Sequence, residues 1–263
     1  MSIINQFRLD NKVAVITGGG RGIGAACARA FAEAGADVVL AARTQSQLDA
    51  VAADIKAMGR RALTVVTDVM EEEQLQRLVD ATIEEFGRLD VLVNNAGGFP
   101  PKPMADTSLK EFDAAFRFNV STAFALTRIA TPHLAAGDEA GAVINISSIA
   151  GHAPSSWFTA YGTAKSSLSY LSQVMAQELA PRIRVNAIAV GSTKTDALNT
   201  VLTPEIEKTM VDLTPMARLG EVEDIAACAL YLASPAASYL TGDILNVNGG
   251  LTNVNMTMPR AFD

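Results

Sequence analysis

Tyr161 and Lys165 are the two residues whose types and spacing most directly suggest chemistry. They are four positions apart in a segment predicted to be helical, so their side chains share one face. Reduction of a ketone needs a proton donor at the carbonyl oxygen, and a tyrosine serves well only if its phenolate form is stabilised. We expect the Lys165 ammonium to lower the pKa of Tyr161 and so provide that stabilisation. The alternative is a solvated contact between two helical side chains.

Two further polar residues could serve the same reaction. Ser148 follows Ser147 at the end of an apolar segment, where its hydroxyl could donate to a substrate oxygen and stabilise developing charge. Asn119 lies inside a long apolar helical segment, which is an unfavourable place for asparagine. That position is expected if its side chain binds a water that supplies protons to Lys165. The alternatives are turn-forming serines and an asparagine whose amide is satisfied inside the protein.

A glycine-rich turn, TGGGRGIG, follows the first apolar segment and contains Gly18, Gly22 and Gly24 in a GxxxGxG arrangement. Glycine permits positive φ and lets a pyrophosphate approach the backbone, while the next helix offers free N–H groups and the positive end of its dipole. We therefore predict a dinucleotide phosphate site here, which also includes Arg21 and Ile23. An ordinary strand-to-helix turn is the alternative.

The end of the second apolar segment bears on the choice of nicotinamide cofactor. An NAD-binding unit usually carries an acidic residue there for the ribose hydroxyls. This chain instead has Arg43 and Thr44, and Asp37 lies at the opposite end of the segment. Arg43 could bind a 2′-phosphate through two hydrogen bonds, with Arg21 as a second cation. We therefore expect NADP(H) to be preferred, with NAD(H) as the second candidate. The alternative is that Arg43 is a solvated residue that opens the next helix.

Short apolar strands and amphipathic helices alternate along the chain. Such alternation predicts an α/β fold with a parallel sheet, right-handed crossovers and helices on both faces. Ligands of such sheets bind beyond the carboxyl ends of the strands. Asp68 and Val69 lie at one such end, and Asp68 could accept a hydrogen bond from an adenine amino group or simply begin a helix. The predicted strands are 12–17, 37–42, 62–67, 89–94, 141–147, 184–189 and 243–247, and the predicted helices are 22–34, 45–58, 71–86, 108–134, 157–179 and 222–233.

Two long segments without clear periodicity, 97–107 and 191–215, are predicted to be substrate loops, because long loops in a compact domain are usually functional. Their apolar residues and two nearby aromatic residues would form a cleft for an alicyclic or medium-chain ketone. The tail 251–263 is either frayed or ordered by a neighbouring subunit or a ligand. The expected cleft residues are Phe99, Pro100, Pro101, Met104, Leu198, Val201, Leu202, Met210, Trp157 and Phe158.

Composition argues against several functions. The formal net charge is -7 and the basic residues are scattered, which disfavours nucleic acid and membrane surfaces as partners. Cys27 and Cys228 lack the spacing of metal or redox motifs, so we expect no metal site. The chain shows no charged leader and no apolar run near the ~20 residues of a membrane span, so we expect a cytoplasmic protein.

The motifs together resemble those of the classical short-chain dehydrogenase/reductase family, and they follow in the family's order between residues 9 and 250. The resemblance implies one Rossmann domain, residues 1–263, with a doubly wound seven-stranded sheet in the order 3-2-1-4-5-6-7. It also implies an oxidoreductase that interconverts a secondary alcohol and a ketone, and assembly as a homotetramer. The motifs are the glycine turn, Asn94-Asn95-Ala96-Gly97, Ser148, and Tyr161-Gly162-Thr163-Ala164-Lys165.

The resemblance also assigns roles to individual positions. Thr195 matches a threonine that binds the nicotinamide amide, although Val190 and Gly191 stand where the family usually has Pro-Gly. Asn94 is expected to stabilise the central strands rather than to contact substrate. The implied catalytic residues are Asn119, Ser148, Tyr161 and Lys165. The implied cofactor-binding residues are Gly18, Arg21, Gly22, Ile23, Gly24, Arg43, Thr44, Asp68, Val69, Asn95, Ala96, Gly97, Tyr161, Lys165, Gly191, Thr193 and Thr195.

Within the family, the segments GGFPPKP and TDALNTVLTPEIEKTM are most similar to bacterial 7α-hydroxysteroid dehydrogenases, which favours an apolar, steroid-like substrate. The core motifs are almost equally similar to 3-oxoacyl-carrier-protein reductases. Such a reductase would need a basic surface for its acidic partner, with Arg128 and Arg182 as candidates. A non-catalytic cofactor-sensing protein of the same fold is the rival from another class. Such proteins often lack the tyrosine or the lysine that this chain retains.

Overall fold

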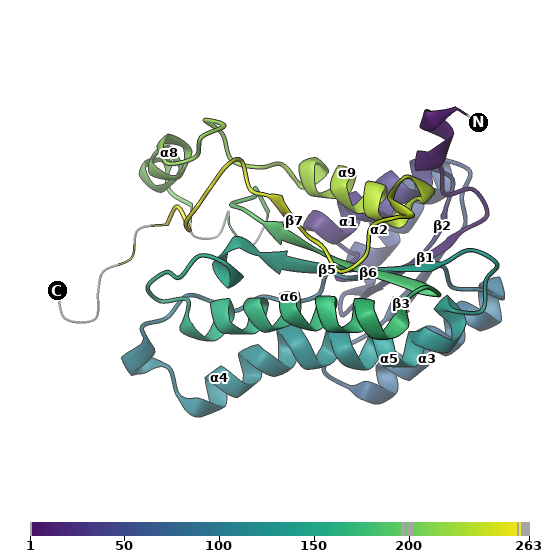
Figure 1. Ribbon diagram of the computed structural model, residues 1–263, viewed down its shortest axis with the longest axis horizontal. Helices are drawn as coiled ribbons and strands as arrows, with labels where there is room; N and C mark the ends of the chain where they lie inside the picture. Colours follow the sequence, from purple (N-terminus) through teal and green to yellow (C-terminus); the bar gives the residue numbers. More distant parts are fainter. Residues whose placement is uncertain (1, 196–197, 199–201, 257, 259–263) are drawn as a thin grey trace.

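The computed structural model, which describes residues 2–195, 198, 202–256 and 258, has a seven-stranded sheet at its centre (Figure 1). Neighbouring strands are parallel and follow the order β3-β2-β1-β4-β5-β6-β7, which confirms the predicted order. Because helices cover both faces, the apolar strands β1, β4, β5 and β6 are buried along their whole length. The strands are β1 Val13–Thr17, β2 Asp37–Ala42, β3 Ala62–Val66, β4 Val91–Asn94, β5 Gly141–Ser148, β6 Ile183–Val190 and β7 Ile244–Val247.

The helices on both faces of the sheet were also predicted (Figure 1). On one face, Phe31 of α1 and Leu232 of α9 are buried in a core cluster with the strands. On the other face, Leu78 of α3 and Leu126 of α5 belong to a second core cluster. Each helix therefore turns an apolar stripe towards the same sheet. The helices are α1 Gly22–Glu33, α2 Gln45–Ala57, α3 Glu72–Phe86, α4 Leu109–Phe116, α5 Thr122–Leu134, α6 Thr159–Leu179, α8 Pro204–Asp212 and α9 Val222–Ala233, and the shorter turns are η1 Ile3–Phe7, η2 Met104–Asp106, η4 Ile149–Gly151 and η5 Pro235–Ala237.

The helix predicted at 108–134 is not one continuous α-helix. A π-helical turn, η3 at Arg117–Ser121, separates α4 from α5 and contains Asn119. The Asn119 Nδ2 donates to the Ala115 carbonyl oxygen at 2.8 Å, so the side chain satisfies an acceptor in the preceding turn. Periodicity does not reveal this feature, because the chain is helical and apolar on both sides of it.

The segment 191–215 was predicted to be a loop, but it contains the helix α8. The Thr203 side chain accepts from the Ile206 N–H at 3.3 Å, and Pro204 is the first helical residue. This start signal was present in the sequence and was missed. A smaller difference concerns α6, which begins at Thr159; Trp157 lies before the helix with a φ of 70°.

The first part of the C-terminal tail packs against its own chain. Leu251 lies in a small buried cluster with Ile149 and Ala153, and Asn255 is 2% exposed. Most of the tail beyond Met256 lies outside the described residues. Among the residues that the structure describes, no helix is long and apolar enough to cross a membrane.

Candidate active site

A cleft of about 700 Å³ opens beyond the carboxyl ends of the central strands, where a parallel sheet of this order is expected to bind its ligand. Its lining contains all the predicted cofactor-binding residues except Gly24, and three of the four predicted catalytic residues. Asn119 lies behind the wall. The lining also includes residues that sequence reasoning missed, and their only signal was a position next to a strand end or a predicted site residue: Gly20, Ala41, Ala42, Gln47, Thr67, Gly98, Phe118, Ile146, Ser147 and Val190.

The glycine turn presents backbone to the cleft. Gly18 and Gly22 both have positive φ, 65° and 54°, which other residues adopt only with strain. Gly24 was predicted to bind the cofactor, but it does not line the cleft. A Cβ at this position would clash with the Gly18 carbonyl oxygen. Gly24 therefore allows α1 to pack against the turn instead of lining the cleft. The turn has room for a pyrophosphate against its backbone, so the residues present fit a dinucleotide.

Hydrogen bonds join the turn to the end of β4. The Thr17 Oγ1 accepts from the N–H groups of Asn95 and Ala96, both at 3.0 Å, and the Asn95 Nδ2 donates to the Thr17 carbonyl at 2.8 Å. Asn94 faces away from the cleft, and its Nδ2 donates to the Asn145 Oδ1 at 2.8 Å. The expectation that Asn94 stabilises the central strands is therefore confirmed.

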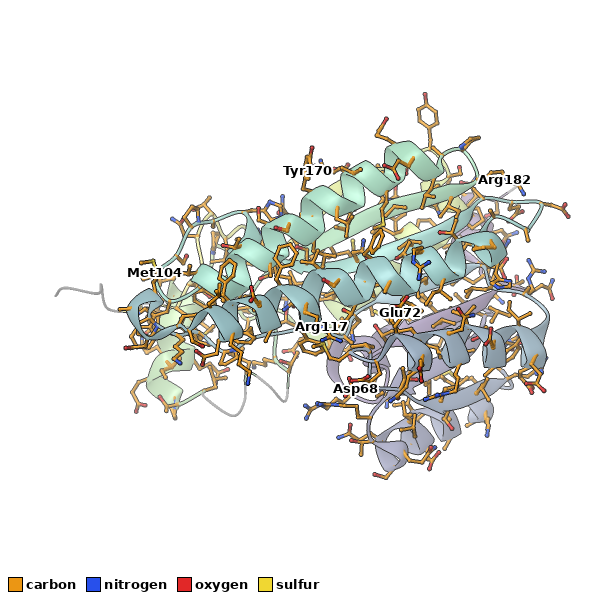
Figure 2. The ribbon with its side chains drawn as sticks, turned by 90° about the horizontal axis from the view of Figure 1, so that it is seen from below. Asp68, Glu72, Met104, Arg117, Tyr170 and Arg182 are labelled. Atoms are coloured by element: carbon orange, nitrogen blue, oxygen red, sulfur yellow. The ribbon has the colours of Figure 1, made fainter. Side chains whose placement is uncertain are left out.

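The end of the cleft that is predicted to hold the adenosine carries an available cation. Arg43 is exposed, lines the cleft and forms no hydrogen bond or ion pair with any residue that the structure describes. Asp37 is occupied at the other end of β2, where it pairs with Arg60 at 2.7 Å. Asp68 lines the same end, near the start of α3 in Figure 2, and its Oδ1 accepts from the Met70 N–H at 3.0 Å. One positive side chain thus stands where a ribose-binding acid would be expected.

Tyr161 and Lys165 lie together on α6, with the Lys165 Nζ 5.7 Å from the centroid of the tyrosine ring. The Nζ donates to the Ile146 carbonyl oxygen at 2.7 Å. Burial lowers the pKa of Lys165 to about 7, because desolvation disfavours the ammonium form.

The expected direction of the Tyr161 pKa shift was wrong for this structure. Burial raises the pKa of Tyr161, and a hydrogen bond with Ser148 lowers it by less. The same burial that disfavours the phenolate also disfavours the Lys165 ammonium that was expected to stabilise it.

Ser148 and Ser147 face different surroundings. Ser148 lines the cleft and its Oγ accepts from the Ala150 N–H at 3.2 Å, whereas the Ser147 Oγ donates to the Lys165 carbonyl oxygen at 3.0 Å. A hydroxyl beside Tyr161 is therefore placed to contact a substrate oxygen, while Ser147 supports the helix that carries Lys165.

Asn119 approaches Lys165 from behind the cleft wall. Its Oδ1 accepts from the Gly98 N–H at 2.8 Å. A Cβ on Gly97 would lie 2.7 Å from the Asn119 Oδ1 and 3.1 Å from the Lys165 Nζ, so Gly97 lies beside both groups. The absence of a side chain at Gly97 keeps this approach open.

The end of the cleft that is predicted to hold the nicotinamide is formed by the segment after β6. Gly191, Thr193 and Thr195 line it, as predicted. Val190 stands where proline was expected from the resemblance, and here it is the last residue of β6 and pairs with Val247 of β7. The N–H that bonds to β7 at this point is that of Gly191, which donates to the Val247 carbonyl oxygen at 3.0 Å.

Of the apolar residues predicted to line the substrate cleft, none that the structure describes lines the 700 Å³ cleft. Met104 is 69% exposed and lies at one end of the molecule in Figure 2, whereas Met210 is 2% exposed because it lies on the inner face of α8. Leu198 and Leu202 are half-buried, and Val201 lies outside the described residues.

Comparisons with known proteins agree with this geometry. The family model described as enoyl-(acyl-carrier-protein) reductase matches residues 18–252. An uncharacterised oxidoreductase of Mycobacterium tuberculosis is 52% identical over 258 residues, covering 98% of each chain. The 7α-hydroxysteroid dehydrogenase of Escherichia coli K12 is 41% identical over 247 residues, covering 94% of this chain and 96% of the relative.

A solved structure of 7α-hydroxysteroid dehydrogenase, complexed with NADH and 7-oxo glycochenodeoxycholic acid, is similar along its whole length. It has a TM-score of 0.92 and 41% identity, and the match covers 97% of this chain and 99% of that one. These similarities show a nicotinamide-dependent oxidoreductase that acts on CH–OH groups. The chain belongs to the short-chain dehydrogenase/reductase family.

Proposed function

We propose that this protein is an NADP(H)-dependent oxidoreductase that interconverts a secondary alcohol and a ketone on an apolar, steroid-like or alicyclic substrate. The observation that carries the cofactor assignment is the exposed guanidinium of Arg43 at the adenosine end of the cleft, without a partner among the described residues. Only NADP(H) offers it a 2′-phosphate, and an unpaired arginine at this place suits bidentate phosphate binding. NAD(H) is the weaker alternative.

When bound, the nicotinamide ring supplies or accepts the hydride at the substrate carbon. Tyr161 holds the proton that is transferred to the carbonyl oxygen in the direction of reduction and accepts it in the direction of oxidation. Ser148 donates a hydrogen bond to the same oxygen. Lys165 holds the ribose end of the cofactor, and its amine lies beside the Tyr161 ring. Asn119 positions the proton path to Lys165.

Other residues of the cleft are proposed to bind the remaining parts of the cofactor. We propose that the glycine turn binds the pyrophosphate, and that Asp68 and Val69 lie along the adenine. Thr195 and the segment before it would hold the nicotinamide amide. The full set proposed for the cofactor is Gly18, Arg21, Gly22, Ile23, Arg43, Thr44, Asp68, Val69, Asn95, Ala96, Gly97, Tyr161, Lys165, Gly191, Thr193 and Thr195, with Gly24 acting through helix packing.

The apolar substrate is favoured over an acyl-carrier substrate because the cations that an acidic carrier protein would need are already engaged. Arg128 pairs with Glu72 at 2.6 Å, and the Arg182 Nη2 donates to the Gly137 carbonyl at 2.7 Å. Figure 2 places Arg182 at the opposite end of the molecule from Met104 of the substrate loop. The 7-oxo bile acid in the solved relative supports a steroid-like ligand.

The cofactor preference is tested by Arg43→Asp. The ratio of kcat/KM for NADPH to kcat/KM for NADH should fall by about 100-fold or more, because a favourable ion pair with the 2′-phosphate is replaced by a repulsion worth several kcal/mol. The matched control is Arg61→Asp, an exposed arginine that lies outside the cleft. An unchanged ratio in Arg43→Asp would exclude Arg43 as the phosphate ligand.

We further propose that residues 1–263 form a single domain, that the protein acts in the cytoplasm and that it assembles as a homotetramer. Tyr170 on α6 is 70% exposed and points away from the body of the molecule in Figure 2, and Phe124 on α5 is 48% exposed. The edge strand β7 is only partly buried. Exposed aromatic side chains on long helices and an uncovered sheet edge are features that assembly would cover.

A further inference from the structure

Asn255, in the C-terminal tail, is a buried amide whose hydrogen-bonding groups are all used. It is 2% exposed. Its Nδ2 donates to the Met210 carbonyl oxygen and to the Thr214 Oγ1, both at 2.9 Å. Its Oδ1 accepts from the hydroxyl of Ser192. A single side chain from the tail therefore bonds to both ends of the segment 191–215.

The two ends that Asn255 joins have different neighbours. Ser192 lies between Gly191 and Thr193, which line the cofactor cleft, whereas Met210 belongs to α8 and Thr214 follows it. Thr214 also donates to the Met210 carbonyl at 2.7 Å, so Asn255 closes a compact set of bonds at the carboxyl end of α8. Figure 1 shows the C-terminal segment, in yellow, passing beside α8 beyond the ends of β5 and β6.

The position of α8 is coupled to the cleft by a second contact. Lys194 lies between Thr193 and Thr195 of the cleft lining, and its Nζ is 3.2 Å from the Glu207 Oε1 of α8. This ion pair is partly exposed and contributes little by itself. The Asn255 bonds are stronger constraints, because breaking them removes the Asn255 acceptor of the Ser192 hydroxyl and one of the two side-chain donors to the buried Met210 carbonyl.

We propose that Asn255 is a positioning residue that fixes α8 against the nicotinamide end of the cleft and thereby shapes the substrate side of the site. It touches neither cofactor nor substrate. The inference rests on the proposed function for its kinetic consequence only, because the position of α8 can be measured without any substrate.

The first experiment measures hydrogen–deuterium exchange of the NADPH-bound full-length protein. In Asn255→Ala, the amides of residues 205–212 should exchange about tenfold faster or more, because the bonds that hold the end of α8 are lost. The matched control is Asn253→Ala, an exposed asparagine two positions away, which should leave the exchange unchanged. Unchanged exchange in α8, or an equal increase throughout the sheet, would overturn the proposal.

The second experiment measures kinetics on a ketone that the wild type reduces. The KM for the ketone should rise about tenfold in Asn255→Ala, while the KM for NADPH and kcat change by less than about threefold. Ser192→Ala removes only the hydroxyl that donates to Asn255, so it should raise the KM for the ketone by less. In the double variant, the increases in KM caused by Ser192→Ala and Asn255→Ala should not be additive. Equal losses in kcat and in both KM values would contradict a positioning role.

The two experiments test the proposed function and the role of Asn255 independently. A wild type that reduces no ketone would count against the proposed function, and the exchange of α8 would still decide the role of Asn255. If Asn255→Ala does not fold, the hydrogen–deuterium exchange of α8 is measured in Ser192→Ala instead.

Discussion

At the scale of single residues, Lys165, which we propose to be catalytic, lies in an environment that disfavours its charged form. It is 4% exposed, and its only described hydrogen-bond acceptor is the Ile146 carbonyl. Lowering its pKa from 10.5 to about 7 corresponds to a cost of up to about 5 kcal/mol for the charged form. Active-site groups often reduce stability in this way, because the site is arranged for the reaction.

This cost predicts a pH-dependent gain in stability for Lys165→Met in the cofactor-free protein. Between pH 7 and pH 10.5 the unfolded chain binds a proton that the native Lys165 does not, so wild-type stability rises with pH in that window. Lys165→Met lacks this dependence. Its free energy of unfolding should exceed that of the wild type by about 2–4 kcal/mol at pH 6.5, and by less than about 1 kcal/mol at pH 10.

Urea unfolding at the two pH values measures the difference. An advantage of Lys165→Met that is equal at both would show that the mutation acts through packing alone. Tyr161→Phe serves as the control, since it removes a neighbouring buried hydroxyl and retains the Lys165 amine.

At the scale of elements, the sequence predicts the helices on both sides of the π-helical turn η3, but it does not predict the turn itself. The apolar pattern of 108–134 correctly predicted helix on both sides of the turn, and the Ser108 and Glu111 capping box marks the start of α4. The extra residue of the π-helical turn does not change the apolar pattern of the sequence. Asn119 was nevertheless singled out, because a polar amide in an apolar stretch required a partner, and its partners are Gly98 and Ala115.

Asn119→Ala should therefore destabilise the protein as well as impair catalysis. Removal of the side chain breaks its bonds to the Ala115 carbonyl and to the Gly98 backbone groups, at a cost of about 2–3 kcal/mol. Ser121→Ala, at an exposed position in the same turn, should change the free energy of unfolding by less than about 0.5 kcal/mol. Chemical denaturation of both variants measures this, and equal effects would show that the Asn119 bonds do not hold the turn.

At the scale of the whole molecule, the strand order followed from the family resemblance, and the location of the cleft followed from that order. Predicted residues such as Gly18, Asp68 and Thr193 lie far apart in the sequence, yet they meet because parallel strands end at one edge of the sheet. The apolar residues of the substrate loops were not placed correctly, because Met210 depends on how α8 packs. The contact of Asn255 with that helix is equally long-range and has no local signal.

Assembly is the property of the whole molecule that can be tested most simply. The wild type should elute with a mass near four chains of 27.6 kDa in light scattering coupled to size exclusion. Phe124→Asp should give smaller species, because an aspartate in a closed apolar contact cannot be solvated. The same substitution at Met58, which is 40% exposed at the end of α2, should leave the mass unchanged. A wild-type monomer would contradict the proposed tetramer.

We propose that Tyr161, Lys165 and Ser148 use NADPH to reduce an apolar ketone. The most direct measurement is the oxidation of NADPH and NADH by the purified protein in the presence of keto-steroids, cyclic ketones and 3-oxoacyl thioesters, with Tyr161→Phe alongside. We predict NADPH-dependent turnover of a keto-steroid or cyclic ketone, and a fall in kcat of about 10²–10⁴-fold in Tyr161→Phe with NADPH binding retained. Cofactor binding without turnover of any apolar ketone, or undiminished turnover by Tyr161→Phe, would contradict the account.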